Sequence, residues 1–136
     1  MFRISHVVAS ITLLAAATGA PAADRRADRG EAGLTKMLAN RVAGKPVSCL
    51  YLRDIRSTQI LDGTAIVYDS GGKLYVNRPD GASTLDDDDI LVTRTFGSQL
   101  CRMDPVGLVS RAGNFQRSFV TLGDFVPYAK VPANKP

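Results

Sequence analysis

The Asp62-Gly63 pair constrains the fold of this chain most strongly, because it separates two short segments of strand-forming residues. Residues 57–61 precede the pair and residues 64–68 follow it. Tight hairpin turns favour residues that tolerate positive φ, and Asp-Gly supplies two of them in a row. The two segments are therefore predicted to pair as an antiparallel hairpin.

Further short segments follow, each bounded by turn residues. Ser70-Gly71-Gly72 predicts a second tight turn that leads into a strand over 73–77, where successive side chains alternate between faces. More strands are predicted at 90–96, 106–109 and 118–122, with a loop over 79–89. The segment 126–136 contains three prolines and is predicted to run along the surface.

One amphipathic helix is predicted ahead of the strands, over residues 31–43. Leu34, Met37, Leu38 and Val42 recur there at helical spacing, and Gly44 and Pro46 end the pattern. The expected fold is mainly β: a small antiparallel sheet or open barrel of about five to six short strands, with this one N-terminal amphipathic helix. We expect residues 31–130 to form a single globular domain whose β region spans 49–126, with residues 1–22 as a signal peptide, a flexible leader at 23–30 and a tail at 131–136.

The first 22 residues have the pattern of a secretory signal peptide. Arg3 provides the positive start, an apolar run of about 11 residues follows, and Ala20-Pro21-Ala22 supplies the small residues of a cleavage site after Ala22. A membrane-spanning helix needs about 20 apolar residues, so the shorter run is interpreted as the core of a signal peptide and not as an anchor. No later segment is long and apolar enough to span a membrane, so no transmembrane segment is expected in the mature chain. We expect an exported protein, periplasmic or secreted.

Cys49 and Cys101 are the chain's two cysteines. In an oxidising compartment two cysteines form one disulfide most simply, although two free buried thiols are the alternative. A bridge over a loop of this length stabilises the fold by roughly 4 kcal/mol in the chain-entropy model. A redox role is disfavoured because the spacing is not Cys-x-x-Cys and no histidine base accompanies them.

The single histidine, His6, lies within the predicted signal peptide. The mature chain therefore lacks the histidine of a Ser-His-Asp triad, of a Cys-His pair and of histidine-ligated zinc or copper. No catalytic residues and no cofactor are predicted, and the chain is interpreted as a non-enzyme more readily than as an enzyme. The formal net charge of +4 is spread along the sequence without a basic cluster interleaved with aromatics, so nucleic acid is not an expected partner.

A run of aspartates is the most conspicuous candidate metal site. Calcium requires six to eight oxygens that converge on one point, and consecutive aspartates point in different directions. The alternative is a solvated, self-repelling loop that also discourages edge pairing, and this is the favoured interpretation. The candidate ligands are Asp80, Asp86, Asp87, Asp88 and Asp89.

Four arginines suggest a second candidate, an anion site. Arg53 and Arg56 precede the predicted hairpin, while Arg94 and Arg102 flank residues 96–101. The two pairs could bind an anion if they faced each other. Scattered surface cations, individually worth little, are the favoured interpretation.

From Pro46 to Pro127 the chain resembles a family of small exported proteobacterial proteins that is classed as a domain of unknown function. The resemblance rests on an ordered set of motifs: Cys49-Leu50, Ile55-Arg56-Ser57, residues 60–66, Leu74-Tyr75-Val76-Asn77, residues 100–104 and residues 122–127. It implies export, a disulfide and one compact domain, and it supplies no activity. Members often carry two more cysteines, whose places here are taken by 81–85 and 118–121, so the resemblance implies a single bridge between Cys49 and Cys101.

Three functions remain open from the sequence. The first is a non-catalytic exported protein that binds a ligand or partner, another envelope protein for example, or that supports the envelope. The second is a calcium-binding or metal-dependent hydrolase module that uses Asp86 to Asp89. The third is an inhibitor or accessory subunit of another envelope protein. A hydrolase needs a concave pocket with convergent carboxylates, whereas a partner-binding protein exposes an apolar patch.

Overall fold

The computed structural model describes residues 21–133, so the body of the predicted signal peptide and residues 134–136 lie outside the described part. One long helix, α1 (Ala22–Met37), is followed by short strands and two 3₁₀ turns, η1 (Leu52–Asp54) and η2 (Ala82–Thr84). The strands are β1 (Arg41–Ala43), β2 (Cys49–Tyr51), β3 (Ile55–Leu61), β4 (Ala65–Ser70), β5 (Lys73–Asn77), β6 (Asp89–Thr93), β7 (Gln99–Cys101), β8 (Pro105–Ser110), β9 (Gln116–Thr121) and β10 (Phe125–Lys130).

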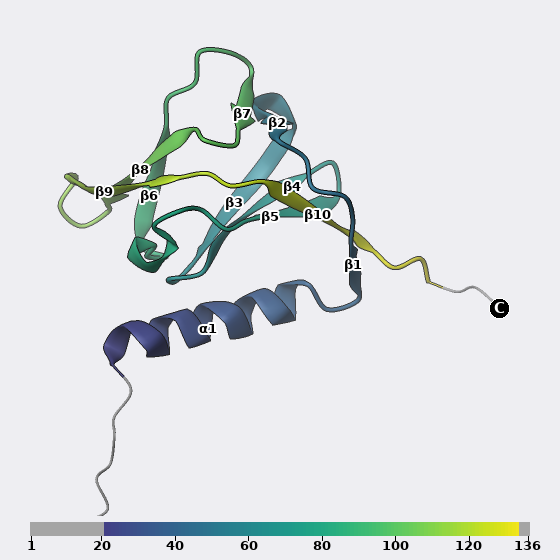
Figure 1. Cartoon of the computed structure of the whole chain (residues 1–136), viewed down its shortest axis with the longest axis horizontal. Coiled ribbons are helices and arrows are strands. Elements are labelled where there is room, and N and C mark those ends of the chain that lie inside the picture. Colours follow the sequence, from purple (N-terminus) through teal and green to yellow (C-terminus); the bar gives the residue numbers. More distant parts are fainter. Residues whose placement is uncertain (1–20, 134–136) are drawn as a thin grey trace, which may run out of the picture.

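The strands form three antiparallel sheets. The largest has the order β1-β10-β5-β4-β3, the second the order β6-β8-β9, and β2 pairs with β7 alone. Helix α1 runs along one side of the molecule and the β2-β7 pair lies at the opposite end (Figure 1). The predicted class, mainly β with open antiparallel sheets and one N-terminal helix, is confirmed, and the described residues contain ten strands where about five to six were predicted.

Strand β4, which lies between β5 and the edge strand β3, explains how the layers are held together. Its residues alternate between two apolar clusters, so both faces of the strand are buried. Ala65 and Val67 pack with Leu34 of the helix, whereas Ile66 and Tyr68 pack with residues of the three-stranded sheet. A strand covered on both faces is a continuous apolar run, which is what residues 65–68 show.

Both predicted turns are confirmed. Asp62-Gly63 joins β3 to β4, with Gly63 at a φ of 58°, and the register pairs Leu61 with Ala65. Gly71 and Gly72 have φ values of 59° and 80° and join β4 to β5. Positive φ at consecutive positions favours glycine, which explains the Gly-Gly pair.

The predicted helix bounds, 31–43, and the flexible leader at 23–30 are wrong. The helix begins at Ala22, includes the whole leader, and ends at Met37. Alanine and arginine are strong helix formers, so the leader can extend the helix even though it lacks large apolar side chains. Asn40 then takes a left-handed φ of 58°, and residues 41–43 pair with β10 as a strand.

The prediction that 126–136 runs along the surface is also wrong for its first half. Strand β10 lies inside the five-stranded sheet, between β1 and β5. The Pro127 carbonyl accepts the Gly44 N–H at 2.7 Å, just beyond the end of β1. The N–H and C=O of a strand residue point to the same side, so the N–H that proline lacks would also point toward the end of β1. Proline is therefore tolerated, because it costs the sheet one hydrogen bond at that end.

Candidate functional site

The predicted aspartate site divides into separate contacts. The Asp86 carboxylate forms an ion pair with Arg26 of α1 at 2.7 Å, while the buried Asp89 carboxylate accepts a hydrogen bond from the Arg117 Nε–H at 2.9 Å. Asp87 and Asp88 are exposed, and Asp80 pairs through its backbone with Thr121. The five predicted ligands therefore do not converge on one point.

Asp62, which the sequence analysis did not select, joins this region. One carboxylate oxygen each from Asp62, Asp86 and Asp87 lies within 4.8 Å of the others. Two guanidinium groups lie against the same cluster, because Arg26 and Arg29 approach Asp62 at 4.0 and 3.9 Å. Asp62 lies in the hairpin turn, far in sequence from Asp86 and Asp87. It comes close to their carboxylates because the turn packs on the 86–89 loop, a contact that the sequence alone does not indicate.

Hydrogen bonding stabilises the ionised form of Asp86. The Asp88 N–H donates to its carboxylate at 3.1 Å, and Arg26 donates to the other oxygen. These contacts lower the pKa of Asp86 below its ordinary value, and the hydrogen bond from the Asp88 backbone has the largest effect. The cluster attaches α1 to the hairpin turn and to the 86–89 loop through opposite charges.

A β-bulge positions the partner of Asp89. The register of β8 and β9 pairs Leu108 with Ser118 and Val109 with Gln116, which leaves Arg117 as the extra residue. A bulge redirects a side chain out of the regular alternation. Arg117 thereby forms a bidentate pair with the buried Asp89 carboxylate, which raises the pKa of the guanidinium.

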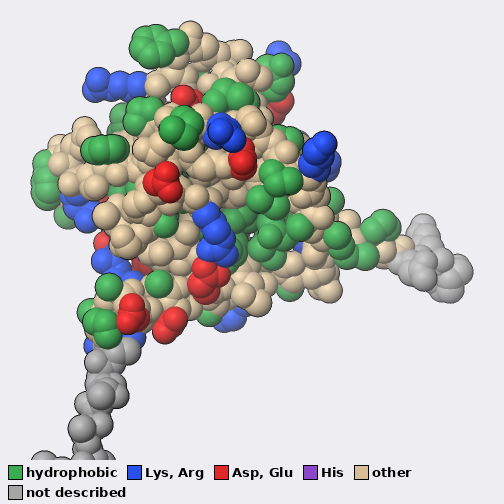
Figure 2. Space-filling model, viewed as in Figure 1, with side chains coloured by type: hydrophobic (Ala, Val, Ile, Leu, Met, Phe, Trp, Pro, Cys, Tyr) green, Lys and Arg blue, Asp and Glu red, His purple; other side chains and the backbone are tan. Residues whose placement is uncertain are grey.

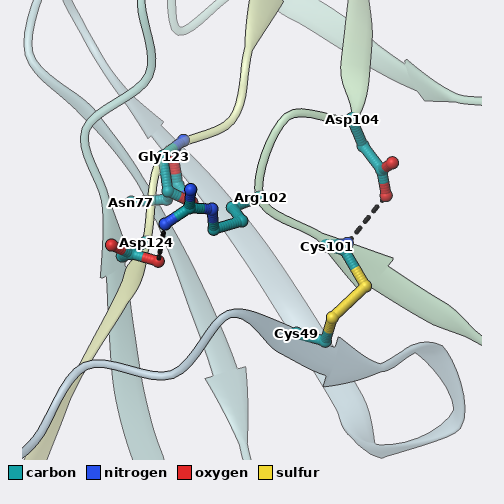
Figure 3. The surroundings of a disulfide bond; sticks show 7 residues. All are labelled: Cys49, Asn77, Cys101, Arg102, Asp104, Gly123 and Asp124. Atoms are coloured by element: carbon teal, nitrogen blue, oxygen red, sulfur yellow. Dashed lines mark hydrogen bonds and ion pairs between the residues drawn. A yellow bond between two sulfur atoms is a disulfide. The ribbon is translucent and has the colours of Figure 1, made fainter.

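The predicted disulfide between Cys49 and Cys101 is confirmed (Figure 3). The two cysteines are directly opposite on β2 and β7, with their Cα atoms 4.0 Å apart. They form a non-hydrogen-bonded pair, because the Cys101 N–H donates instead to the Asp104 carboxylate at 2.7 Å. The bridge reinforces a pair of strands with three residues each.

The outer side of the three-stranded sheet exposes apolar side chains. Val92, Gly107 and Phe119 face one another across β6, β8 and β9, and Ile90 is the next outward residue on β6. Phe119 is 63% exposed, and Ile90 and Val92 are 40% exposed. We call Ile90, Val92, Gly107 and Phe119 the outer apolar face.

Gly107 makes this face concave at its centre. The glycine has no side chain between Val92 and Phe119, so these residues border a depression of about 240 Å³. Arg94 lies at its rim, and Arg111 lines the neighbouring depression beside Ile90. Neither arginine has an ion-pair partner among residues 21–133.

The four arginines of the predicted anion site do not face one another. Arg53 and Arg56 line one depression together with Lys73, whereas Arg94 lies beside the outer apolar face. Arg102 approaches Asp124 at 3.7 Å, as Figure 3 shows. The two predicted pairs are therefore separate features of the surface.

Comparisons with known proteins add no assignment: no family model, no curated protein and no solved structure matches the chain. The resemblance stated from the sequence motifs thus stays a prediction. No helix within residues 21–133 is long and apolar enough to cross a membrane. Ala22, the predicted cleavage position, is the first residue of α1, and the predicted export signal before it lies outside the described residues, apart from Pro21.

Proposed function

We propose that the chain is an exported, disulfide-bonded, non-catalytic domain that binds another envelope protein through its outer apolar face. The observation that carries the proposal is the row Val92, Gly107 and Phe119, in which an exposed aromatic and an exposed valine border a hollow on the three-stranded sheet. Contiguous exposed apolar residues with a polar rim are typical of protein-binding surfaces.

The charges around the face favour a partner different from the chain itself. Arg94 borders the hollow, Arg111 shares the depression beside Ile90 with Asp87 and Asp89, and the whole chain carries a formal net charge of +4. Two copies packed face to face would bring like charges together, which disfavours association. A partner with an acidic rim around an apolar ridge has the complementary chemistry.

A calcium-binding or hydrolytic role has less support. Asp62, Asp86 and Asp87 are close together, but Arg26 and Arg29 already compensate their charge. A cation would have to displace at least one of these guanidinium groups. An inhibitor or accessory subunit remains compatible with the proposal, since both act by binding a partner.

The proposal is tested by affinity capture from envelope extract, with the exported form of the protein as bait. Phe119→Ser and Val92→Thr alter the outer apolar face, whereas Val131→Ser changes a residue just beyond β10 whose exposure, 50%, lies between theirs. A protein captured by the parent and by Val131→Ser, but lost with both face variants, is expected. That protein, once purified, should then bind the parent directly with a measurable Kd.

Two results would overturn the proposal. The first is an identical set of captured proteins from all four baits. The second is a concentration-dependent dimer in analytical ultracentrifugation that Phe119→Ser abolishes, because the face would then bind a second copy.

A further inference from the structure

The end of the molecule opposite α1 exposes apolar side chains from two segments that are distant in sequence. Phe96, in the loop between β6 and β7, is fully exposed at 112%, while Tyr51 and Leu52 are 48% and 36% exposed. The register places Tyr51 opposite Gln99, and the Leu52 N–H donates to the Ser98 carbonyl at 2.9 Å. The two segments are therefore joined at one end, which we call the tip (Figure 1).

Cations accompany these apolar residues. The Arg53 guanidinium lies 5.4 Å from the centre of the Tyr51 ring, so the cation is held beside the apolar group. Arg56 and Lys73 line the same depression of about 430 Å³ as Arg53.

The acidic residue in this depression does not balance the charge. Asp54 lines it together with Arg53, Arg56 and Lys73, and its Oδ1 lies 3.7 Å from the Arg53 Nε. Both partners are at least half exposed, so solvent screens the pair strongly. The depression retains an excess of positive charge. Figure 2 shows apolar side chains with Lys and Arg side chains on either side at this end.

We infer that the tip docks on the surface of an anionic phospholipid bilayer. A protruding aromatic ring can enter the interfacial region, where aromatic side chains are favoured. Guanidinium groups beside it bind lipid phosphates through paired hydrogen bonds. A single inserted group gives only weak binding, so the apolar and electrostatic contributions are required together.

The shape of the tip favours a bilayer over a second protein. Phe96 projects fully from a loop, whereas the outer apolar face is a sheet surface with a hollow. The three-stranded sheet stands to the side of the tip and α1 lies at the far end (Figure 1). Docking by the tip therefore leaves the outer apolar face accessible, and the inference does not depend on the proposed partner.

The chain contains no tryptophan, so a single introduced tryptophan reports on its own position. In Phe96→Trp, vesicles of phosphatidylcholine with phosphatidylglycerol should shift the emission to shorter wavelength, because the indole leaves water. Vesicles of phosphatidylcholine alone should not. Phe115→Trp, at another exposed phenylalanine between β8 and β9, is the matched control and should show no shift with either vesicle.

Vesicle sedimentation of the exported protein measures the affinity. Phe96→Ser should lower partitioning onto the anionic vesicles by about tenfold, because serine cannot bury the apolar area that the Phe96 ring buries in the bilayer. Arg53→Gln with Arg56→Gln should lower it at least as much, since each cation near an anionic surface contributes about 1 kcal/mol, or roughly fivefold. Arg111→Gln, on the turn between β8 and β9, removes one positive charge away from the tip and should stay close to the parent. Raised salt should release the protein.

Three outcomes would overturn the inference: equal sedimentation with neutral and anionic vesicles, no loss on Phe96→Ser, or release of bound protein by inorganic phosphate at an ionic strength matched with chloride. The last outcome would assign the depression to a free anion. Phe96 and Arg53 are highly exposed, so these variants should keep the parent's thermal melting, which circular dichroism verifies.

Discussion

Replacing Gly30 with alanine tests how α1 is held against the hairpin of β3 and β4. Gly30 is buried, and a Cβ at this position would lie 2.2 Å from the Asp62 carbonyl oxygen and 2.2 Å from the Thr64 Oγ1. A backbone carbonyl cannot rotate out of the way as a flexible side chain can. The helix must therefore move away from the hairpin turn.

The cost follows from the contacts that this movement breaks. Exposure of Leu34, which is 4% exposed in the structure, costs about 2 kcal/mol. Loss of the hydrogen bond from the Thr64 hydroxyl to the Ala27 carbonyl, at 3.1 Å, costs about 1 kcal/mol. Alanine restores about 1 kcal/mol through its higher helix propensity. The free energy of unfolding should fall by about 2 kcal/mol, or roughly 10 °C in Tm.

Gly33→Ala is the matched control, three residues further along the same helix. Its Cβ would meet only the Leu61 Cδ2 at 3.5 Å, an ordinary contact, so the helix-propensity gain of about 0.5–1 kcal/mol should persist. Urea unfolding followed by circular dichroism compares both variants with the parent. If both alanines stabilise the protein to the same extent, α1 is not packed on the hairpin and the reasoning is refuted.

Three further predictions concern the bridge, the core and the acidic cluster. Replacing Cys49 and Cys101 together with alanine should lower the free energy of unfolding by about 4 kcal/mol in urea, because the bridge closes a separation of 52 residues; an unchanged midpoint would contradict this. Tyr68→Phe should raise stability by about 1 kcal/mol, since the buried Tyr68 hydroxyl has no hydrogen-bond partner among the described residues; a loss of stability would mean that the hydroxyl is satisfied. The lowered pKa of Asp86 stabilises the fold above the carboxyl's ordinary pKa, and this contribution is lost as the pH falls through the lowered value. Thermal melts from pH 6 down to pH 2 should therefore fall more steeply in the parent than in Asp86→Asn, and parallel curves would exclude the contribution.

Local signals in the sequence were sufficient for the hairpins and the fold class. Asp62-Gly63 and Gly71-Gly72 determine their turns through backbone conformation alone, so no distant contact was needed to predict them. The start of α1 was different. The leader has no apolar stripe, and its helix is held by distant partners, with Arg26 paired to Asp86 and Gly30 packed on Asp62 and Thr64.

The missed strands depend on pairing across the chain. Strand β10 contains Pro127, which signals a loop in isolation, and its place in the sheet depends on β1 and β5 on either side. Strands β2 and β7 have three residues each, too few for a periodic pattern. The predicted Cys49–Cys101 pair nevertheless marked where these two strands meet.

The candidate surfaces were the least predictable part. Val92 and Phe119 become neighbours only when Gly107 is placed between them by the sheet register. The basic and aromatic residues of the tip were not recognised as a cluster because Tyr51 and Phe96 are far apart along the chain. The aspartate run was conspicuous, yet its members form contacts with different partners.

The central claim, that the outer apolar face binds another envelope protein, is tested most directly by photo-crosslinking in cells that produce the protein with its predicted export signal. A photoreactive phenylalanine analogue replaces either Phe119 or Val131, both of which are at least half exposed. The account predicts a discrete crosslinked product with another protein from position 119 and none from position 131. The same products from both positions, or a crosslink from position 119 only to a second copy of the chain, would contradict it.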